Sequence, residues 1–272
     1  MSGWKTVLAG AAVVGVLLIG PGSVAAQGAP VKMEWLSWSH FRFPSPAGKI
    51  VLTNPFVTNP DSPITLGQVT NADLILVANG HRDEVGSAPE IAIKTGAKLL
   101  AINELVNGLF KFKGVPEDRL LAAGTGDVFT VEGIRVRVMN SLHGSGVRTH
   151  TPAAPYGGPA AGFIITFENG LSVYFAGSTA ITLDMQLWGS LYKPVVAILP
   201  LAARRDPRDL AHMVRLLRTE NPNLKTVIPH HHRLKPPPGA PTPADLEREV
   251  KDLGLPVSVL NPELGKTYTL SK

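Results

Sequence analysis

Most of the histidines in this sequence stand directly after segments that are predicted to be buried β-strands. Five of the eight histidines do so, in company with acidic, amide and hydroxyl side chains. The strands predicted at 73–78, 134–140, 171–176 and 225–229 are followed, in turn, by Asn79-Gly80-His81-Arg82-Asp83-Glu84, His143, Gly177-Ser178-Thr179 and His230-His231-His232. Imidazole and carboxylate groups bind divalent cations and transfer protons. Because ligands bind beyond the carboxyl ends of strands in open α/β sheets, these side chains are predicted to converge on one site.

The alternative for any one of these histidines is a structural role at the surface or as a cap. Four separate strand ends that carry ligand-type residues favour a common site instead. Adjacent residues that leave a strand point in alternating directions, so His231 is the member of the triple histidine expected to point inward. Cations near the same mouth are predicted to attract an anionic substrate, with a solvated basic face as the alternative: Arg204, Arg205, Arg208, Arg233 and Lys235.

Composition limits the kind of metal site and the kind of partner. The chain has no cysteine, which excludes disulfides and thiolate ligands, so any metal is held by His, Asp, Glu or weaker oxygen donors. The formal net charge is +5, and loss of a leader that carries only Lys5 lowers it by one. This mild excess does not imply a nucleic-acid partner.

The first 26 residues are predicted to be a signal peptide. Lys5 precedes the apolar run Thr6 to Gly20, and Val24-Ala25-Ala26 supplies the small residues that a signal peptidase accepts. The alternative is a membrane anchor, but the run is short for a span of about 20 residues and lacks a stop-transfer charge cluster. The expectation is a periplasmic or secreted protein that does not stay on the membrane after cleavage.

Residues 31–272 are predicted to form one α/β domain, because short apolar runs alternate with helical patterns throughout. Two hairpins are expected, at Glu168-Asn169-Gly170 and at Glu132-Gly133, since Asn-Gly and similar pairs tolerate positive φ. Strands are predicted near 31–36, 49–53, 73–78, 98–101, 126–131, 134–140, 161–167, 171–176, 195–199, 225–229, 257–260 and 266–270.

Five helices are predicted, each preceded by a residue suited to the N-cap. Five prolines within 233–243 predict an exposed loop there. The aromatic cluster near the mature N-terminus is predicted to lie mostly in the core, with Trp38 or His40 facing the pocket as the alternative. The helices span 87–95, 103–110, 182–191, 207–219 and 242–252, with Ser87, Asn103, Thr182, Asp206 and Thr242 as the expected N-caps.

Taken in order, these elements resemble the metallo-β-lactamase superfamily, and more narrowly its bacterial metal-dependent hydrolases related to the ascorbate-phosphate lactonases. The resemblance covers nearly the whole mature chain and implies a four-layer αββα sandwich. It also rests on Asn54-Pro55-Phe56, where that family has Asp-Pro-Phe, on Pro159 to Phe163 before a hairpin, and on Leu191-Tyr192-Lys193-Pro194 before a strand ending in Leu199-Pro200.

The metal-binding signature implied by the resemblance is partly replaced. Where the family has His-x-His-x-Asp-His, this chain has Asn79, His81, Asp83 and Glu84. The family's next metal-binding histidine matches His143, and its last one matches His231. The family's bridging aspartate corresponds to Ser178. A neutral serine cannot offset the repulsion between two cations. An asparagine offers only a carbonyl oxygen, which suits hard cations better than zinc. A site for one ion is therefore expected in place of two.

Two functions remain open from the sequence. The first is a hydrolase of an ester, lactone or phosphoester in which His81, His143 and either Glu84 or His231 hold one Zn, Mn or Fe ion. In that case Asp83 orients or deprotonates a water, and Ser178 helps to place a small substrate. The second is a non-catalytic relative that binds a small ligand, because Asn54, Asn79 and Ser178 are all neutral replacements. Neither the substrate nor the oligomeric state follows from the sequence.

Overall fold

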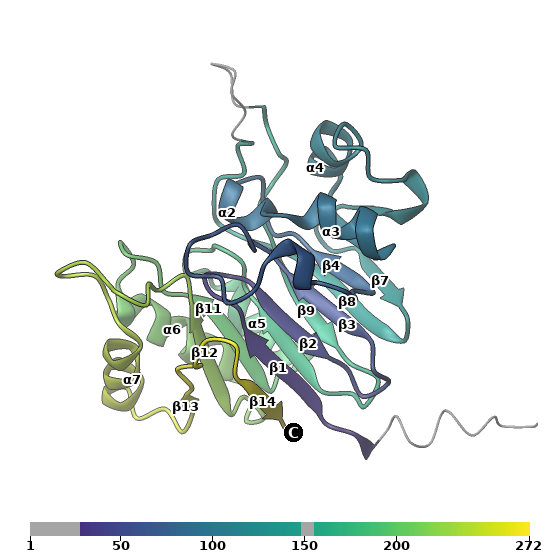
Figure 1. The fold of residues 1–272 in the computed structure, drawn as a ribbon. Helices are drawn as coiled ribbons and strands as arrows, with labels where there is room; N and C mark the ends of the chain where they lie inside the picture. The colour runs from purple at the N-terminus through teal and green to yellow at the C-terminus, as the bar shows by residue number, and fades with distance from the viewer. Residues whose placement is uncertain (1–27, 148–154) are drawn as a thin grey trace, which may run out of the picture.

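The computed structural model describes residues 28–147 and 155–272. The predicted signal peptide lies outside the described residues. Within the described part of the chain, no helix combines the length and the apolar character that crossing a membrane requires. Two sheets face each other, and helices cover their outer sides (Figure 1).

The first sheet contains seven strands in the order β14-β1-β2-β3-β4-β5-β6. The run from β3 to β6 is parallel, and the remaining pairs are antiparallel. The strands are β1 (Val31–Trp35), β2 (Phe41–Pro44), β3 (Ile50–Thr53), β4 (Leu74–Leu76), β5 (Lys98–Ile102), β6 (Leu120–Ala123) and β14 (Thr267–Leu270).

The second sheet also contains seven strands, in the order β13-β12-β11-β10-β9-β8-β7. Because β9 is antiparallel to both β8 and β10, strands β8, β10, β11 and β12 all run in one direction. Their carboxyl ends therefore meet at one edge. The strands are β7 (Val128–Val131), β8 (Ile134–Asn140), β9 (Ala161–Thr166), β10 (Ser172–Phe175), β11 (Val196–Pro200), β12 (Thr226–His230) and β13 (Ser258–Val259).

Three apolar clusters define four layers. One lies between the sheets, where residues such as Phe41 and Phe163 are fully buried. A second joins the outer face of the first sheet to α3 (Ala88–Thr95) and to the π-helical turn η2 (Val106–Phe110), which follows α4 (Asn103–Leu105). The third joins the outer face of the second sheet to α5 (Asp184–Tyr192), α6 (Pro207–Arg218) and α7 (Pro243–Asp252). The predicted αββα sandwich is confirmed.

Local sequence signals explain most element boundaries. The Asp206 carboxylate accepts a hydrogen bond from the backbone of Arg208, and Thr242 forms a capping box with Asp245. Both hairpins form, with positive φ at Gly133 and Gly170. The expected N-caps at Asn103 and Thr182 are wrong by one residue, because the preceding Ile102 and the following Leu183 hold those positions.

Strands β2 and β6 were not predicted. Each has only four residues, too few for an alternating pattern to stand out, and β2 ends in proline. Three short turns also fall outside the predicted elements: η1 (Leu66–Gln68), α2 (Arg82–Val85) and η3 (Glu117–Arg119).

Two buried histidines, His40 and His232, make the fold sensitive to acid. Burial lowers the pKa of His40 to about 3 and that of His232 to about 4. Both rings are neutral in the folded protein, whereas the unfolded chain takes up a proton near pH 6.5. Stability is therefore full above pH 6.5 and falls as the pH drops toward 4. Each of these histidines is expected to lower the free energy of unfolding by about 2 kcal/mol when the pH falls from 7.5 to 5.

Urea unfolding at pH 7.5 and at pH 5 measures this loss. The midpoint is expected to fall by an amount that corresponds to more than one proton taken up on unfolding. An unfolding free energy that is the same at both pH values contradicts the assignment of these rings as neutral core groups.

Candidate active site

The segment after β4 forms a compact turn that fixes three candidate side chains. Asn79 Oδ1 accepts a hydrogen bond from the backbone N–H of His81 at 2.9 Å. The His81 carbonyl in turn accepts from the backbone N–H groups of Glu84 and Val85, at 3.0 and 2.8 Å, and so closes the single turn of α2. Asn79 thus shapes the turn through its carbonyl oxygen, which is already engaged. Asp83 lies in the middle of this turn, between His81 and Glu84.

Gly80 allows this turn to pack against the loop after β8. Its N–H donates to Ser145 Oγ at 3.0 Å, and a Cβ atom there would lie 2.7 Å from the Ser145 carbonyl oxygen. Only glycine permits such an approach. As a result the rings of His81 and His143 lie edge to face, with centroids 5.0 Å apart. The two predicted ligands are therefore neighbours.

His143 is held in the form that binds metal. Partial burial, followed by the positive charges of His81 and Arg205, lowers the pKa of His143 to about 4. The ring is therefore neutral near pH 7, and one nitrogen lone pair is available to a cation.

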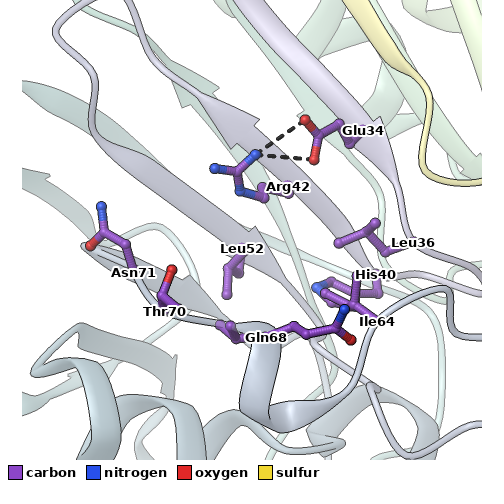
Figure 2. Close-up of a pocket in the computed structure, with 10 residues that line it drawn as sticks. Glu34, Leu36, His40, Arg42, Leu52, Ile64, Gln68, Thr70 and Asn71 are labelled. Atoms are coloured by element: carbon purple, nitrogen blue, oxygen red, sulfur yellow. Dashed lines mark hydrogen bonds and ion pairs between the residues drawn. The ribbon is translucent and has the colours of Figure 1, made fainter.

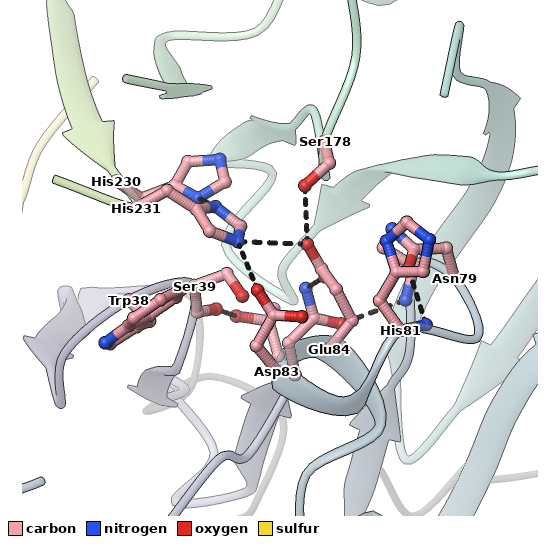
Figure 3. A network of polar contacts seen from close by, with 12 residues as sticks. Trp38, Ser39, Asn79, His81, Asp83, Glu84, Ser178, His230 and His231 are labelled. Carbon is pink, nitrogen blue, oxygen red and sulfur yellow. Dashed lines mark hydrogen bonds and ion pairs between the residues drawn. The ribbon is translucent and has the colours of Figure 1, made fainter. Parts of the chain in front are cut away.

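Glu84 is buried, with 1% of its surface exposed, and protein groups occupy its carboxylate. Ser178 Oγ donates to Oε1 at 2.7 Å, the amide of Asn54 donates to Oε2, and His231 Nε2 lies 3.3 Å from Oε1 (Figure 3). Burial raises the pKa of Glu84, and the charge of His231 and the Ser178 hydrogen bond offset part of that rise. Three positions at which the sequence departs from the family signature thus meet in one hydrogen-bonded cluster.

Backbone geometry brings the members of this cluster together. Gly177, with φ of 59°, has no room for a Cβ, which would lie 2.5 Å from the Ala161 carbonyl oxygen. It lets the chain turn so that Ser178 reaches Glu84. Asn54 has φ of 42° and its Oδ1 accepts from the Ala78 N–H at 2.9 Å, which aims its amide group at the carboxylate.

Asp83 lies at the border between this cluster and the solvent, with 31% of its side chain exposed. Its Oδ2 is 3.6 Å from His231 Nε2. Burial raises the pKa of Asp83, but the hydrogen bond and charge of His231 lower it more, so the pKa lies below its usual value. Asp83 is therefore an ionised carboxylate that lines the same cavity as His81 and His143 and is able to accept a proton.

The triple histidine directs one ring, that of His231, toward Asp83 and Glu84. All three rings are buried. His231 has φ of 63°, which breaks the alternation of a strand, and its N–H donates to the Trp38 carbonyl at 3.2 Å. His230 stacks on Phe175 and shares a hydrogen bond of 2.7 Å with His231, between their Nδ1 atoms; His232 stacks on Trp35.

A cavity of about 320 Å³ opens beside these groups. A second hollow of about 340 Å³ shares Trp38, His81 and Asp83 with it and extends to Phe56 and Arg82, neither of which was predicted as a site residue. Of the five predicted cations, Arg204, Arg205 and Arg233 line the cavity, while Arg208 and Lys235 do not. The cavity is lined by Trp38, His81, Asp83, His143, Ser178, Pro200, Ala202, Ala203, Arg204, Arg205, His231 and Arg233.

The four predicted metal ligands fall into two groups. His81 pairs with His143, whereas Glu84 and His231 contact each other. Within residues 28–147 and 155–272, no group of three or more His, Asp or Glu side chains is arranged to hold a metal ion as it stands. The donor types nevertheless fit one divalent ion on the His81 side, where two imidazoles line the same cavity as the Asp83 carboxylate. On the Glu84 side each carboxylate oxygen accepts a hydrogen bond from a protein donor.

The whole fold is similar to solved structures of other proteins. The metallo hydrolase Igni18 of Ignicoccus hospitalis superimposes with a TM-score of 0.74 at 28% identity, over 90% of this chain and 100% of that one. YhfI of Bacillus subtilis, a metallo-β-lactamase fold protein, superimposes with a TM-score of 0.65 at 10% identity, over 89% of this chain and 100% of that one. The fold is therefore the metallo-β-lactamase fold.

Sequence similarity to curated proteins identifies the family within this fold. A UPF0173 metal-dependent hydrolase of Rubrobacter xylanophilus is 35% identical over 232 residues, which cover 84% of this chain and 92% of that protein. No protein-family model matches the chain. The chain belongs to the UPF0173 metal-dependent hydrolases. Membership implies a divalent metal, and the resemblance inferred from the strand-end clusters is confirmed.

Proposed function

We propose that this protein is a hydrolase that uses one divalent ion to cleave an ester, lactone or phosphoester in a small substrate. His81 and His143 hold the ion, which is Zn, Mn or Fe. The observation that carries the proposal is the division of the site. The His81 and His143 rings and the Asp83 carboxylate face a cavity. The Glu84 carboxylate instead accepts hydrogen bonds from Asn54 and Ser178 and lies beside His231.

Each side chain has a defined task in this proposal. When bound, the ion supplies positive charge that lowers the pKa of a water molecule. Asp83 orients the attacking water and accepts its proton, a role suited to a carboxylate that is ionised and partly exposed. Ser178 lines the cavity but commits its proton to Glu84, so it is a positioning residue. His231 holds Asp83 and Glu84 in place through Nε2.

Assays of the purified protein with an ester, a lactone and a phosphoester test this proposal. Hydrolysis of at least one class, lost in the His143→Ala variant, is the expected result. Turnover that is unchanged by this substitution contradicts the proposal.

An anionic substrate is the second part of the proposal. Arg204, Arg205 and Arg233 line the cavity. Arg233 also lies over the Trp38 ring at 5.9 Å, which holds its guanidinium at the mouth. Guanidinium groups bind carboxylate and phosphate in paired hydrogen bonds.

Neutralising one of these arginines is expected to weaken substrate binding more than turnover. The Arg233→Gln variant should raise KM for an anionic substrate about tenfold with little change in kcat, because it removes a charge-assisted contact made equally before and during reaction. Steady-state kinetics measure this split. The matched control is Arg215→Gln on the exposed face of α6, which should leave KM unchanged. Equal effects of both substitutions contradict a role for Arg233 at the site.

The competing proposal is a non-catalytic protein that binds a small ligand in the same cavity. It is supported by the same hydrogen-bonded cluster, because a site whose second half is closed by protein donors has lost part of the chemistry implied by the family signature. Turnover of any of the three substrate classes that depends on His143 rules it out.

Export is a further part of the proposal. We infer a cleaved signal peptide over 1–26, a single catalytic domain over 31–272 and a periplasmic or secreted location, from the apolar run and the small residues before position 27. Amino-terminal sequencing of the protein from its native envelope or medium tests this inference. A retained Met1 contradicts cleavage.

A further inference from the structure

A second cavity, of about 200 Å³, lies on the outer face of the first sheet, beneath the segment 64–71 (Figure 2). Its floor consists of side chains that point away from the core between the sheets, from β1, β2, β3 and the turn between β1 and β2. It shares no lining residue with either hollow at the active site. An inference about this cavity therefore stands apart from the proposed hydrolase function.

His40 lines this cavity and is fully buried, yet neither of its ring nitrogens has a hydrogen-bond partner among the described residues. Buried polar side chains are hydrogen-bonded in the great majority of cases. A buried donor or acceptor without a partner is destabilising. Because His40 is one of the residues that line the cavity, a ligand seated there lies against this ring.

The cavity offers no free charge to a ligand. Arg42 Nη1 donates to both carboxylate oxygens of Glu34 at 3.1 Å, so the two opposite charges at the cavity offset each other. Burial lowers the pKa of His40 to about 3, which keeps the ring neutral. Among the described residues that line the cavity, Glu34 and Arg42 are the ones with formal charge. An ionic ligand would lose its hydration without gaining an opposite charge.

The walls and the size define the rest of the ligand. Leu36, Leu52, Ile64 and Val69 provide apolar surface, and Gln68 stands at the exposed rim. A volume of about 200 Å³ corresponds to roughly seven water molecules, which is the space of one six-membered ring with a small substituent. An apolar body of that size can be buried with a gain from the hydrophobic effect.

We propose that this cavity binds a small uncharged molecule with an apolar body and one hydroxyl group, of the size and chemistry of a phenol. The hydroxyl group hydrogen-bonds to His40 inside the cavity. Because a hydroxyl both donates and accepts, it pairs with whichever ring nitrogen faces it, in either neutral tautomer. The apolar body packs against the leucine and isoleucine side chains of the walls.

Titration calorimetry of the purified protein with phenol, benzene and benzoate tests the proposal. Phenol is expected to bind at one equivalent and about fivefold more tightly than benzene, since one hydrogen bond is worth about 1 kcal/mol. Benzoate is expected not to bind this cavity. The His40→Phe variant should lose the preference for phenol over benzene.

Two further variants separate this cavity from the active site and from a folding defect. Ile64→Trp fills the cavity from its partly exposed rim and should abolish phenol binding while the melting temperature stays near that of the wild type. His143→Ala should leave phenol binding unchanged. The proposal is overturned if phenol and benzene bind with equal affinity, or if phenol binding survives Ile64→Trp or is lost in His143→Ala. It is also overturned if no saturable binding is seen, in which case water occupies the cavity.

Discussion

Replacement of His143 by alanine is expected to lower kcat/KM by about a thousandfold or more for any ester, lactone or phosphoester that the protein hydrolyses. His143 and His81 have adjacent rings and are the proposed ligands of the ion. With one imidazole gone, the ion is held too weakly to acidify a water molecule at neutral pH. Steady-state kinetics with saturating metal in the buffer measure the loss.

The fold should not change in this variant, because His143 is an exposed residue at the cavity rim. The matched control is Leu142→Ala, which truncates the neighbouring exposed side chain in the same loop. It should retain activity within about threefold. A His143→Ala protein with normal kcat/KM, or a Leu142→Ala protein that is equally inactive, contradicts the assigned role.

Replacement of Glu84 by alanine is expected to lower the free energy of unfolding by about 3–5 kcal/mol, one of the largest effects at a polar position. The carboxylate is buried and accepts from Asn54 and Ser178, beside His231. Its removal leaves these buried polar groups without a partner and creates a cavity. Urea unfolding monitored by circular dichroism measures the change.

Two comparisons identify the cause of this loss. Glu84→Gln keeps the volume and one acceptor oxygen, so it should cost less than the alanine variant. Glu247→Ala, on the exposed face of α7, should change stability by less than about 0.5 kcal/mol. If Glu84→Ala costs no more than this control, the carboxylate is not the hub of the cluster, and its freedom to bind a second ion would have to be reconsidered.

Local sequence patterns predict the layers and much of the site. Asn169-Gly170 and Glu132-Gly133 each fix a hairpin through positive φ, and Pro207 after Asp206 marks the start of α6. The rule that ligands bind beyond the carboxyl ends of strands predicts from the sequence alone that His81, Asp83 and His143 lie at one edge. Strong short-range signals and a topological rule suffice for these features.

The pairing inside the site depends on contacts that a single sequence does not reveal. Asn54 follows β3 and Glu84 follows β4, and their hydrogen bond exists because those strands are parallel neighbours and Asn54 has positive φ. The burial of His232 likewise depends on stacking against Trp35 from the opposite sheet. Alternation along a strand gives no information on either contact. The sequence predicts Glu84 as a metal ligand, and it does not predict that Asn54 and Ser178 donate hydrogen bonds to its carboxylate.

Metal analysis of the purified mature protein by mass spectrometry, before and after addition of Zn²⁺, Mn²⁺ or Fe²⁺, tests the central claim most directly. One equivalent of metal per chain is expected, falling to a small fraction in the His143→Ala protein, because one side of the site offers two imidazoles and the other is closed by hydrogen bonds. Two tightly held equivalents, or a protein that takes up no metal under any of these conditions, would contradict the account.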